Sequence, residues 1–193
     1  MAGVKGILLA TTVRGIHGAI SGGALTREAA ESRLEARDVE LLDEKLDPTR
    51  WYPVSSIANM ADLLAGVMGG PSEEALRRLG GGAAEILRAS RTYQQLNFEP
   101  GCLQMGDVTQ LRSLGRLIAS VWPAMYDFGT TRVEAEPESS AIVLRFEQLG
   151  TCPAAVRHTI EGFTARIADL ISEGALEASY PECSADQIVI RLG

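Results

Sequence analysis

The chain has 193 residues, of which 46% are hydrophobic and 22% charged, with a formal net charge of -7. This length and composition suit one globular domain with a substantial core, expected over residues 1–193. The acidic balance argues against nucleic acid or an anionic membrane surface as the partner, because both require clustered Lys and Arg.

No window of the sequence approaches the roughly 20 apolar residues of a membrane span, so no membrane span is expected. The N-terminus also lacks the long apolar stretch of a secretory signal, and we expect a cytoplasmic protein. The three cysteines, Cys102, Cys152 and Cys183, are odd in number and widely spaced. Such spacing favours free thiols in a reducing compartment over a disulfide framework.

The first part of the chain predicts helices. Residues 4–20 place their apolar side chains mostly on one side of a helix, and Thr26 suits the N-cap of a second, short helix. Residues 38–49 are acidic and irregular, with room for one turn of helix at Val39–Leu42. A third, amphipathic helix is predicted to open at Pro53, directly after Trp51 and Tyr52, since Pro at the first helical position loses no needed N–H.

Two longer helices follow, from Ser72 to about Leu96 and from Asp107 to about Met125. Gly80-Gly81-Gly82 interrupts the first of them. Three helical glycines forfeit roughly 2–3 kcal/mol of helix propensity relative to alanine, so a bare backbone must serve a purpose there. Close packing of another helix is one explanation, and a ligand lying against the helix is the other.

After Gly129 the pattern changes to alternation typical of strands. A hairpin, a helix and a second pair of strands are predicted at residues 130–136, 141–146, 153–172, 175–180 and 187–192. The resulting fold class is α+β. A helical part at about residues 4–126 packs on an antiparallel sheet formed by a β-β-α-β-β part at about residues 129–193.

Few residues suggest catalysis. The two histidines, His17 and His158, are single residues on predicted helices, and we interpret both as structural although Glu161 is within helical reach of His158. The chain lacks a phosphate-binding glycine loop and a Gly-x-Ser-x-Gly nucleophile motif. We therefore predict that the protein is not an enzyme and carries no cofactor.

The cysteines allow a reactive thiolate, a metal site or buried free thiols. Cys152 precedes a predicted helix, whose N-terminus favours a thiolate, and Cys183 falls in the last predicted turn beside Glu182. A zinc site needs about four ligands, and only two good ones are present. Buried free thiols are therefore the favoured interpretation. The aromatic residues near helix ends either anchor the core or line an apolar pocket.

The order of short motifs resembles a known family. Trp51-Tyr52-Pro53 opens a helix after an acidic stretch, Leu79-Gly80 follows about one helix later, and residues 122–129 precede a hairpin. Further along come Cys152, Glu161-Gly162-Phe163, Gly174 and Cys183. This arrangement resembles an uncharacterised family of myxobacterial paralogues, related to vinyl-4-reductase domains, TRAPP vesicle-tethering subunits and haem–nitric-oxide-binding sensors.

The resemblance implies an often dimeric ligand-binding fold, with helices packed on a twisted four-stranded antiparallel sheet. In vinyl-4-reductase-type domains, cysteines and a glutamate hold zinc. Cys152 and Cys183 match two of those ligands, but Tyr180 and Arg191 stand where Glu and Cys are expected. The zinc site is therefore predicted to be a remnant, with no metal. Haem is disfavoured too, because no histidine falls in the fourth or fifth predicted helix.

We therefore predict a non-enzymatic sensor or adaptor domain that binds a small hydrophobic ligand between its helices and its sheet. The expected ligand-binding residues are Trp51, Tyr52, Gly81, Trp122, Tyr126 and Phe163. The alternative is a TRAPP-like protein-interaction scaffold or small-GTPase partner, dimeric and without ligand. A homodimer is the expected assembly.

Overall fold

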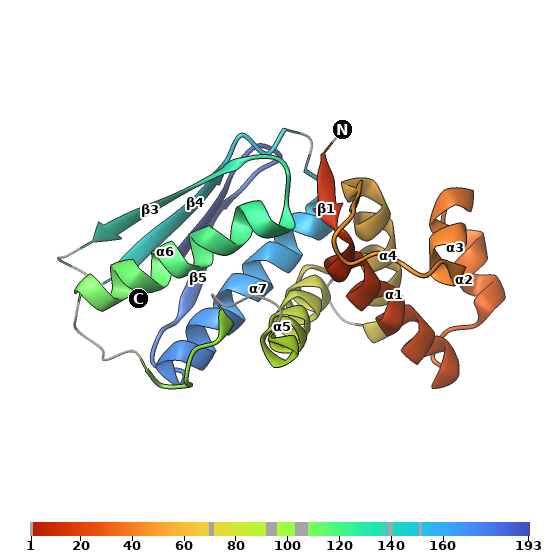
Figure 1. The fold of residues 1–193 in the computed structure, drawn as a ribbon, viewed down its shortest axis with the longest axis horizontal. Helices are drawn as coiled ribbons and strands as arrows, with labels where there is room; N and C mark the ends of the chain where they lie inside the picture. The colour runs from red at the N-terminus through yellow and green to blue at the C-terminus, as the bar shows by residue number, and fades with distance from the viewer. Residues whose placement is uncertain are drawn as a thin grey trace.

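The computed structural model describes residues 2–69, 72–91, 96–102, 108–136, 138, 141–150 and 152–193. An N-terminal group of helices stands beside a C-terminal sheet, and α6 and α7 pack against the sheet (Figure 1). The helices are α1 (Gly6–Ser21), α2 (Arg27–Arg33), α3 (Ala36–Asp43), α4 (Val54–Met68), α5 (Ser72–Ser90), α6 (Val108–Met125) and α7 (Ala154–Ser172). The strands are β1 (Gly3–Lys5), β2 (Trp51–Pro53), β3 (Thr130–Glu136), β4 (Ala141–Glu147), β5 (Ala178–Cys183) and β6 (Ile188–Leu192).

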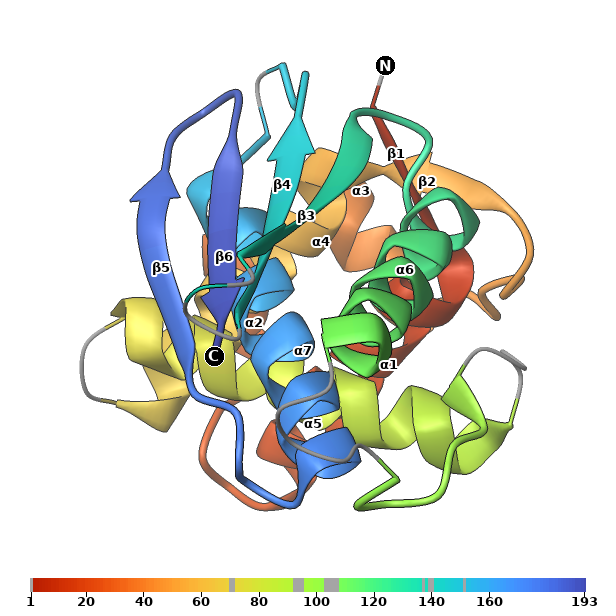
Figure 2. The ribbon, with the colours of Figure 1, turned by 90° about the vertical axis from the view of Figure 1, so that its left-hand side faces the viewer.

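The main sheet has the order β3-β4-β6-β5, and every neighbouring pair is antiparallel. Its strands twist across the sheet, as Figure 2 shows. The predicted α+β class, the antiparallel sheet of four strands and the β-β-α-β-β order are confirmed. Apolar side chains on one face of β4 and β6 are buried towards α6 and α7; they include Ile142, Leu144, Phe146, Ile188 and Ile190.

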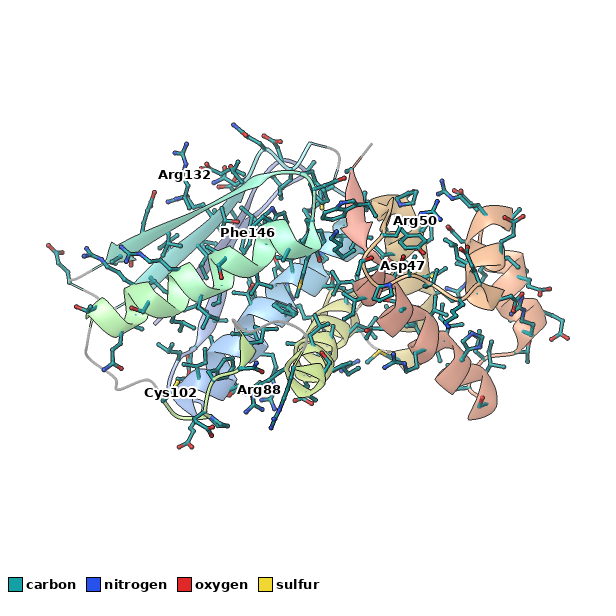
Figure 3. All side chains as sticks on the ribbon, in the orientation of Figure 1. Asp47, Arg50, Arg88, Cys102, Arg132 and Phe146 are labelled. Atoms are coloured by element: carbon teal, nitrogen blue, oxygen red, sulfur yellow. The ribbon has the colours of Figure 1, made fainter. Side chains whose placement is uncertain are left out.

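The opposite face of the sheet carries ion pairs between strands. Arg132 pairs with Glu147 at 3.1 Å, and Arg145 pairs with Glu134 at 3.1 Å. Arg132 points away from the helices in Figure 3, whereas Phe146 lies between the sheet and α6. The aliphatic stems of such arginines can shield apolar residues on the same face. The alternating glutamates of β3 therefore belong to a salt-bridged outer surface.

Strand β5 is irregular. Its pairing with β6 shifts register between Ser179 and Glu182, and Pro181 lies within the shift. Cys183 consequently ends β5 and pairs with Ile188, whereas the sequence placed it in a turn. The prediction was wrong because proline is usually a turn signal, and here it stands on an edge strand, where a missing N–H is tolerated.

Helices α5 and α7 meet backbone to backbone. A Cβ atom on Gly80 would lie 2.0 Å from the carbonyl oxygen of Thr159, and one on Gly162 would lie 1.9 Å from that of Arg77. Either distance is far shorter than any carbon–oxygen contact, so both positions require glycine. Close helix packing therefore explains Gly80 in the glycine run. A Cβ on Gly82, by contrast, would meet nothing within 4 Å.

Some predicted boundaries change. Trp51–Pro53 form β2, which pairs with β1 through Val4 and Tyr52, and α4 begins one residue later than expected. Helix α3 covers Ala36–Asp43, which is longer than the single helical turn expected at Val39–Leu42. Helix α5 ends at Ser90. The sequence predicted that it continues to about Leu96, and residues 92–95 of that segment lie outside the described residues. Among the described helices, none is both long and apolar enough to cross a bilayer.

Gly80→Ala and Gly82→Ala test the contact between α5 and α7 as a matched pair. Alanine gains about 1 kcal/mol of helix propensity over glycine at either position. We expect Gly82→Ala to raise the free energy of unfolding by about 0.5–1 kcal/mol, because its methyl group meets open space. Gly80→Ala should lower it by about 2 kcal/mol, since the methyl group collides with α7. Urea unfolding measures both values, and equal stabilisation would contradict the contact.

Candidate functional site

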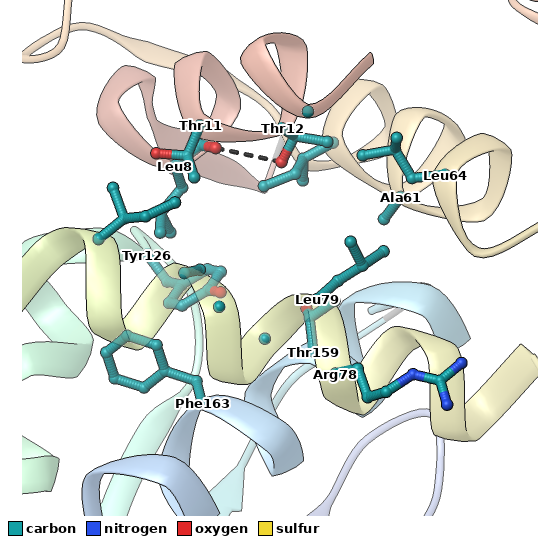
Figure 4. A pocket seen from close by; sticks show the side chains of 16 residues that line it. Leu8, Thr11, Thr12, Ala61, Leu64, Arg78, Leu79, Tyr126, Thr159 and Phe163 are labelled. Atoms are coloured by element: carbon teal, nitrogen blue, oxygen red, sulfur yellow. Dashed lines mark hydrogen bonds between the residues drawn. The ribbon is translucent and has the colours of Figure 1, made fainter. Parts of the chain in front are cut away.

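A pocket of about 210 Å³ lies between α1, α4, α5 and α7, and Tyr126, next after α6, lines it as well (Figure 4). Its walls are mostly apolar. They include Leu8 of α1, Ala61 and Leu64 of α4, Leu79 and Ile86 of α5, and Phe163 of α7. The Ile86 side chain is 41% exposed, which places this edge of α5 at the opening to solvent.

The threonines of the lining are already hydrogen-bonded. Thr11, Thr12 and Thr159 each donate the side-chain hydroxyl to a backbone carbonyl three or four residues earlier in their own helix, at 2.8–3.2 Å. Helical threonines commonly make this bond, and it leaves their hydroxyl donors engaged. These side chains therefore add little free donor capacity to the pocket.

Arg78 is the charged residue of the lining. Its guanidinium donates to the Glu74 carboxylate at 3.2 Å and to the Gly69 carbonyl at 3.3 Å. Figure 4 shows this side chain extending away from the pocket. The positive charge is therefore directed to the surface of α5, and the pocket itself is uncharged.

Tyr126 is the polar exception. Its ring stacks on Trp122 with centroids 4.4 Å apart and meets Phe128 edge-on at 5.6 Å. Its hydroxyl has no hydrogen-bond partner among the described residues and turns towards the pocket in Figure 4. Burial raises the pKa of the Tyr126 phenol well above its usual range, so the hydroxyl keeps its proton at neutral pH. It is a free donor and acceptor in an apolar pocket.

A smaller cavity of about 30 Å³ lies on the sheet side of this pocket, between α6, α7 and β4. Trp122 and Phe146 line it, and Leu8, Tyr126 and Phe163 line both spaces. A cavity of this size has room for a water molecule but not for a ring-sized ligand. The two cavities are therefore neighbours that share Leu8, Tyr126 and Phe163 as walls.

The predicted ligand-binding residues divide into two groups. Tyr126 and Phe163 line the pocket, and Trp122 lines the smaller cavity beside it. Trp51, Tyr52 and Gly81 line neither space.

The three residues outside the cavities have other contacts. Trp51 is 38% exposed, with the Lys5 ammonium 3.8 Å above its ring. Tyr52 is buried, and its hydroxyl accepts from the Asp47 N–H at 3.1 Å. A Cβ on Gly81 would approach Arg166 of α7 at 3.6 Å, so this glycine faces the neighbouring helix.

Sequence reasoning missed the contribution of α1. Leu8, Thr11, Thr12 and Gly15 all line the pocket, and their spacing of three, four and seven residues places them on one helix face. Small and weakly polar residues on a helix face that points inward are a possible signal for a pocket. The prediction weighed aromatic residues instead.

The cysteines differ in exposure. Cys102 is exposed in the loop before α6 (Figure 3), Cys152 is buried, and Cys183 is half-buried. Burial raises the pKa of the Cys152 thiol to about 12, which agrees with the favoured interpretation of a buried free thiol and outweighs the helix N-terminus. Burial and the nearby Glu161 carboxylate raise the pKa of Cys183 as well.

Comparison with known proteins identifies the fold. No family model matches the chain, and no curated protein matches it. An H-NOX protein from S. oneidensis in the Fe(II)NO ligation state is similar, with a TM-score of 0.65, 16% identity and 98% of each chain covered. The Fe(II) unliganded H-NOX protein from K. algicida has a TM-score of 0.61 and 9% identity, covering 98% of this chain and 95% of that one. The chain therefore has the H-NOX fold over nearly its whole length.

The pocket does not fit the haem that this fold implies. Pockets for drug-sized ligands occupy about 300–1,000 Å³; this one, at about 210 Å³, is smaller, and haem is larger than most drugs. Haem iron is usually held by His, Cys, Met or Tyr. Among the described lining residues only Tyr126 is of these types, and its raised pKa disfavours the phenolate that would bind iron. His17 and His158 lie elsewhere, bonded to the Leu42 carbonyl and to Glu161.

Thiol reactivity tests the cysteine assignments. Near neutral pH an aromatic disulfide reagent should react rapidly with one thiol per chain, Cys102, because attack requires an accessible thiolate. Cys152 and Cys183, whose pKa values are raised, should react at least tenfold more slowly. Cys102→Ser should abolish the fast phase, and Cys152→Ser should preserve it. A fast phase in Cys102→Ser would contradict the assignment.

Proposed function

We propose that this protein is a non-enzymatic sensor or adaptor domain whose pocket takes a small, uncharged and mainly apolar molecule. The observation that carries the proposal is the pocket of about 210 Å³ within an H-NOX fold. An engineered apolar cavity of about 150 Å³ binds benzene. This pocket therefore has room for a molecule of one or two rings.

The lining limits the chemistry of the ligand. A charged ligand would lose its hydration in a pocket whose one charged side chain, Arg78, is directed outward. A ligand with one hydroxyl or amine could bond to the free Tyr126 hydroxyl, while its rings contact Leu79 and Phe163. Phenols, indoles and naphthols have this combination of groups.

Occupancy of the pocket can act on the rest of the domain. Its walls come from α1 and α4 of the N-terminal helices and from α7, which also contacts β5 and β6. The backbone of Tyr126 forms an antiparallel β-bridge with the backbone of Val4 in β1. A ligand that fills this space would favour one placement of the N-terminal helices relative to α7, which is the requirement for a sensor.

The pocket supports this reading over the TRAPP-like scaffold, which needs no internal space. The relation to the myxobacterial paralogues, vinyl-4-reductase domains and TRAPP subunits stays a prediction from the motifs. The homodimer and the cytoplasmic location also stay predictions. Native mass spectrometry of the protein from its own host, beside a denatured control, would measure both its oligomeric state and any retained small molecule.

Gly82→Leu tests the pocket with a matched control, Gly18→Leu. Both glycines are helical and exposed and face open space, but only Gly82 lines the pocket. Leucine at position 82 should obstruct the opening, so we expect at least a tenfold loss of affinity for 2-naphthol. Gly18→Leu should bind like the unchanged protein. Titration calorimetry measures both, and equal affinities would contradict binding in this pocket, as would the absence of any binding by the unchanged protein.

Tyr126→Phe tests the polar contact. Losing one hydrogen bond costs about 1 kcal/mol, so we expect roughly five- to tenfold weaker binding of 2-naphthol. Naphthalene, which has no hydroxyl, should bind the variant and the unchanged protein alike. Tyr180→Phe serves as the control, because Tyr180 lies outside the pocket lining. Equal losses for both probes would show that the ring position, and not the hydroxyl, had been disturbed.

A further inference from the structure

We propose that His158, Glu161 and Cys183 form a zinc-binding site on the side of α7 that faces α5 and β5. A ring nitrogen of His158, a carboxylate oxygen of Glu161 and the Cys183 Sγ all lie within 4.8 Å of one another. His158 and Glu161 are three residues apart on α7 and so share a helix face. Cys183 reaches this face from the end of β5.

The spacing is close to that of a coordination sphere. His158 Nδ1 is 2.9 Å from Glu161 Oε2. In tetrahedral zinc, ligand atoms at 2.0–2.3 Å from the metal stand roughly 3.3–3.7 Å from one another. Small side-chain rotations therefore suffice to bring the three donors around one ion.

An unpartnered buried atom marks the position of the ion. The Glu161 side chain is fully buried, and its Oε2 accepts from Arg77 Nε at 2.8 Å. Its Oε1 has no hydrogen-bond partner among the described residues. The Cys183 thiol lies beside this carboxylate, whose negative charge contributes to the raised pKa of the thiol. A buried carboxylate oxygen left without a partner is costly, and a bound cation would satisfy it.

The donor set is the one that zinc prefers. Imidazole nitrogen, thiolate sulfur and carboxylate oxygen are its usual ligands, and three protein ligands plus one water form an open zinc site. Arg77 would hold the carboxylate in place as an outer hydrogen-bond donor. Zinc would displace the proton of the Cys183 thiol, so binding would release a proton.

The surrounding charges permit a cation. Arg77 and Arg157 are nearby and positive, but Arg77 is paired with Glu161 and lies 3.6 Å from Glu73. The Glu73 carboxylate is also 4.0 Å from His158 Nε2. The two carboxylates, of Glu73 and Glu161, balance the charges of the two arginines. A zinc ion together with the Cys183 thiolate adds one net positive charge to this neutral group.

This site differs from the remnant inferred from sequence. That remnant consisted of Cys152 and Cys183, and no metal was expected. The structure places His158 and Glu161 beside Cys183, and Cys152 is outside the group of donors that lie within reach of one another. Because of the register shift in β5, Cys183 lies at the end of this strand and pairs with Ile188. The positions of the cysteines in the sequence do not reveal this shift.

Cobalt titration of the metal-free full chain tests the proposal, because Co²⁺ bound to thiolate gives a charge-transfer absorption band. We expect one equivalent to produce the band, and zinc to displace it. Cys183→Ser should abolish the band, and His158→Gln should weaken Co²⁺ affinity at least tenfold. Cys102→Ser and His17→Gln, which change the same residue types elsewhere, should behave like the unchanged protein.

Thiol mapping in the unchanged protein keeps the test independent of variant folding. Zinc should slow the labelling of Cys183 at least tenfold and leave the labelling of Cys102 unaffected, as read by mass spectrometry. No thiolate band at one equivalent, or a band that survives in Cys183→Ser, would overturn the proposal. Loss of the band in Cys152→Ser would overturn this ligand set. Binding of naphthol, which belongs to the other side of α7, should not respond to zinc.

Discussion

The backbone contact between α5 and α7 determines what the rest of the structure can do. With Gly80 against Thr159 and Gly162 against Arg77, the two helices approach more closely than side chains would permit. That approach lets the Arg77 guanidinium reach the buried Glu161, which neighbours Gly162. On the other side of the same contact, α5 and α7 together form one wall of the apolar pocket. One pair of glycines therefore sets the geometry of both candidate sites.

The sheet and most helices could be predicted because their patterns are local. Alternation along β3, the apolar run of β4 and helical spacing along α7 are visible in windows of 7–19 residues. Strands β1 and β2 have three residues each and pair across a long segment, as in Val4 with Tyr52. No local pattern of three residues can specify such a partner, and Trp51–Pro53 were therefore assigned to a helix start.

The candidate pocket was predictable only in part, for a related reason. Aromatic residues such as Tyr126 and Phe163 draw attention in a sequence. The contribution of Gly82 and Gly15 depends on which helix faces them. The glycine run offered two explanations, and both apply: Gly80 packs against α7 and also borders the pocket, whereas Gly82 borders the pocket without a close neighbour. For Cys152, the sequence offered a thiolate at the helix N-terminus and a buried thiol, and the favoured buried thiol agrees with the structure. An H-NOX fold at 16% identity likewise leaves the contents of the pocket open, since function depends on sites and not on folds.

The irregular strand β5 has a consequence for association between chains. A regular edge strand offers a row of free N–H and C=O groups to any other strand, which invites aggregation. Pro181 removes one donor, and the shift between Ser179 and Glu182 bends the row at the same place. The opposite edge, β3, is seven residues long and pairs with β4 in unbroken register. If the sheet extends into a second chain, the regular edge at β3 is the one that can pair with it.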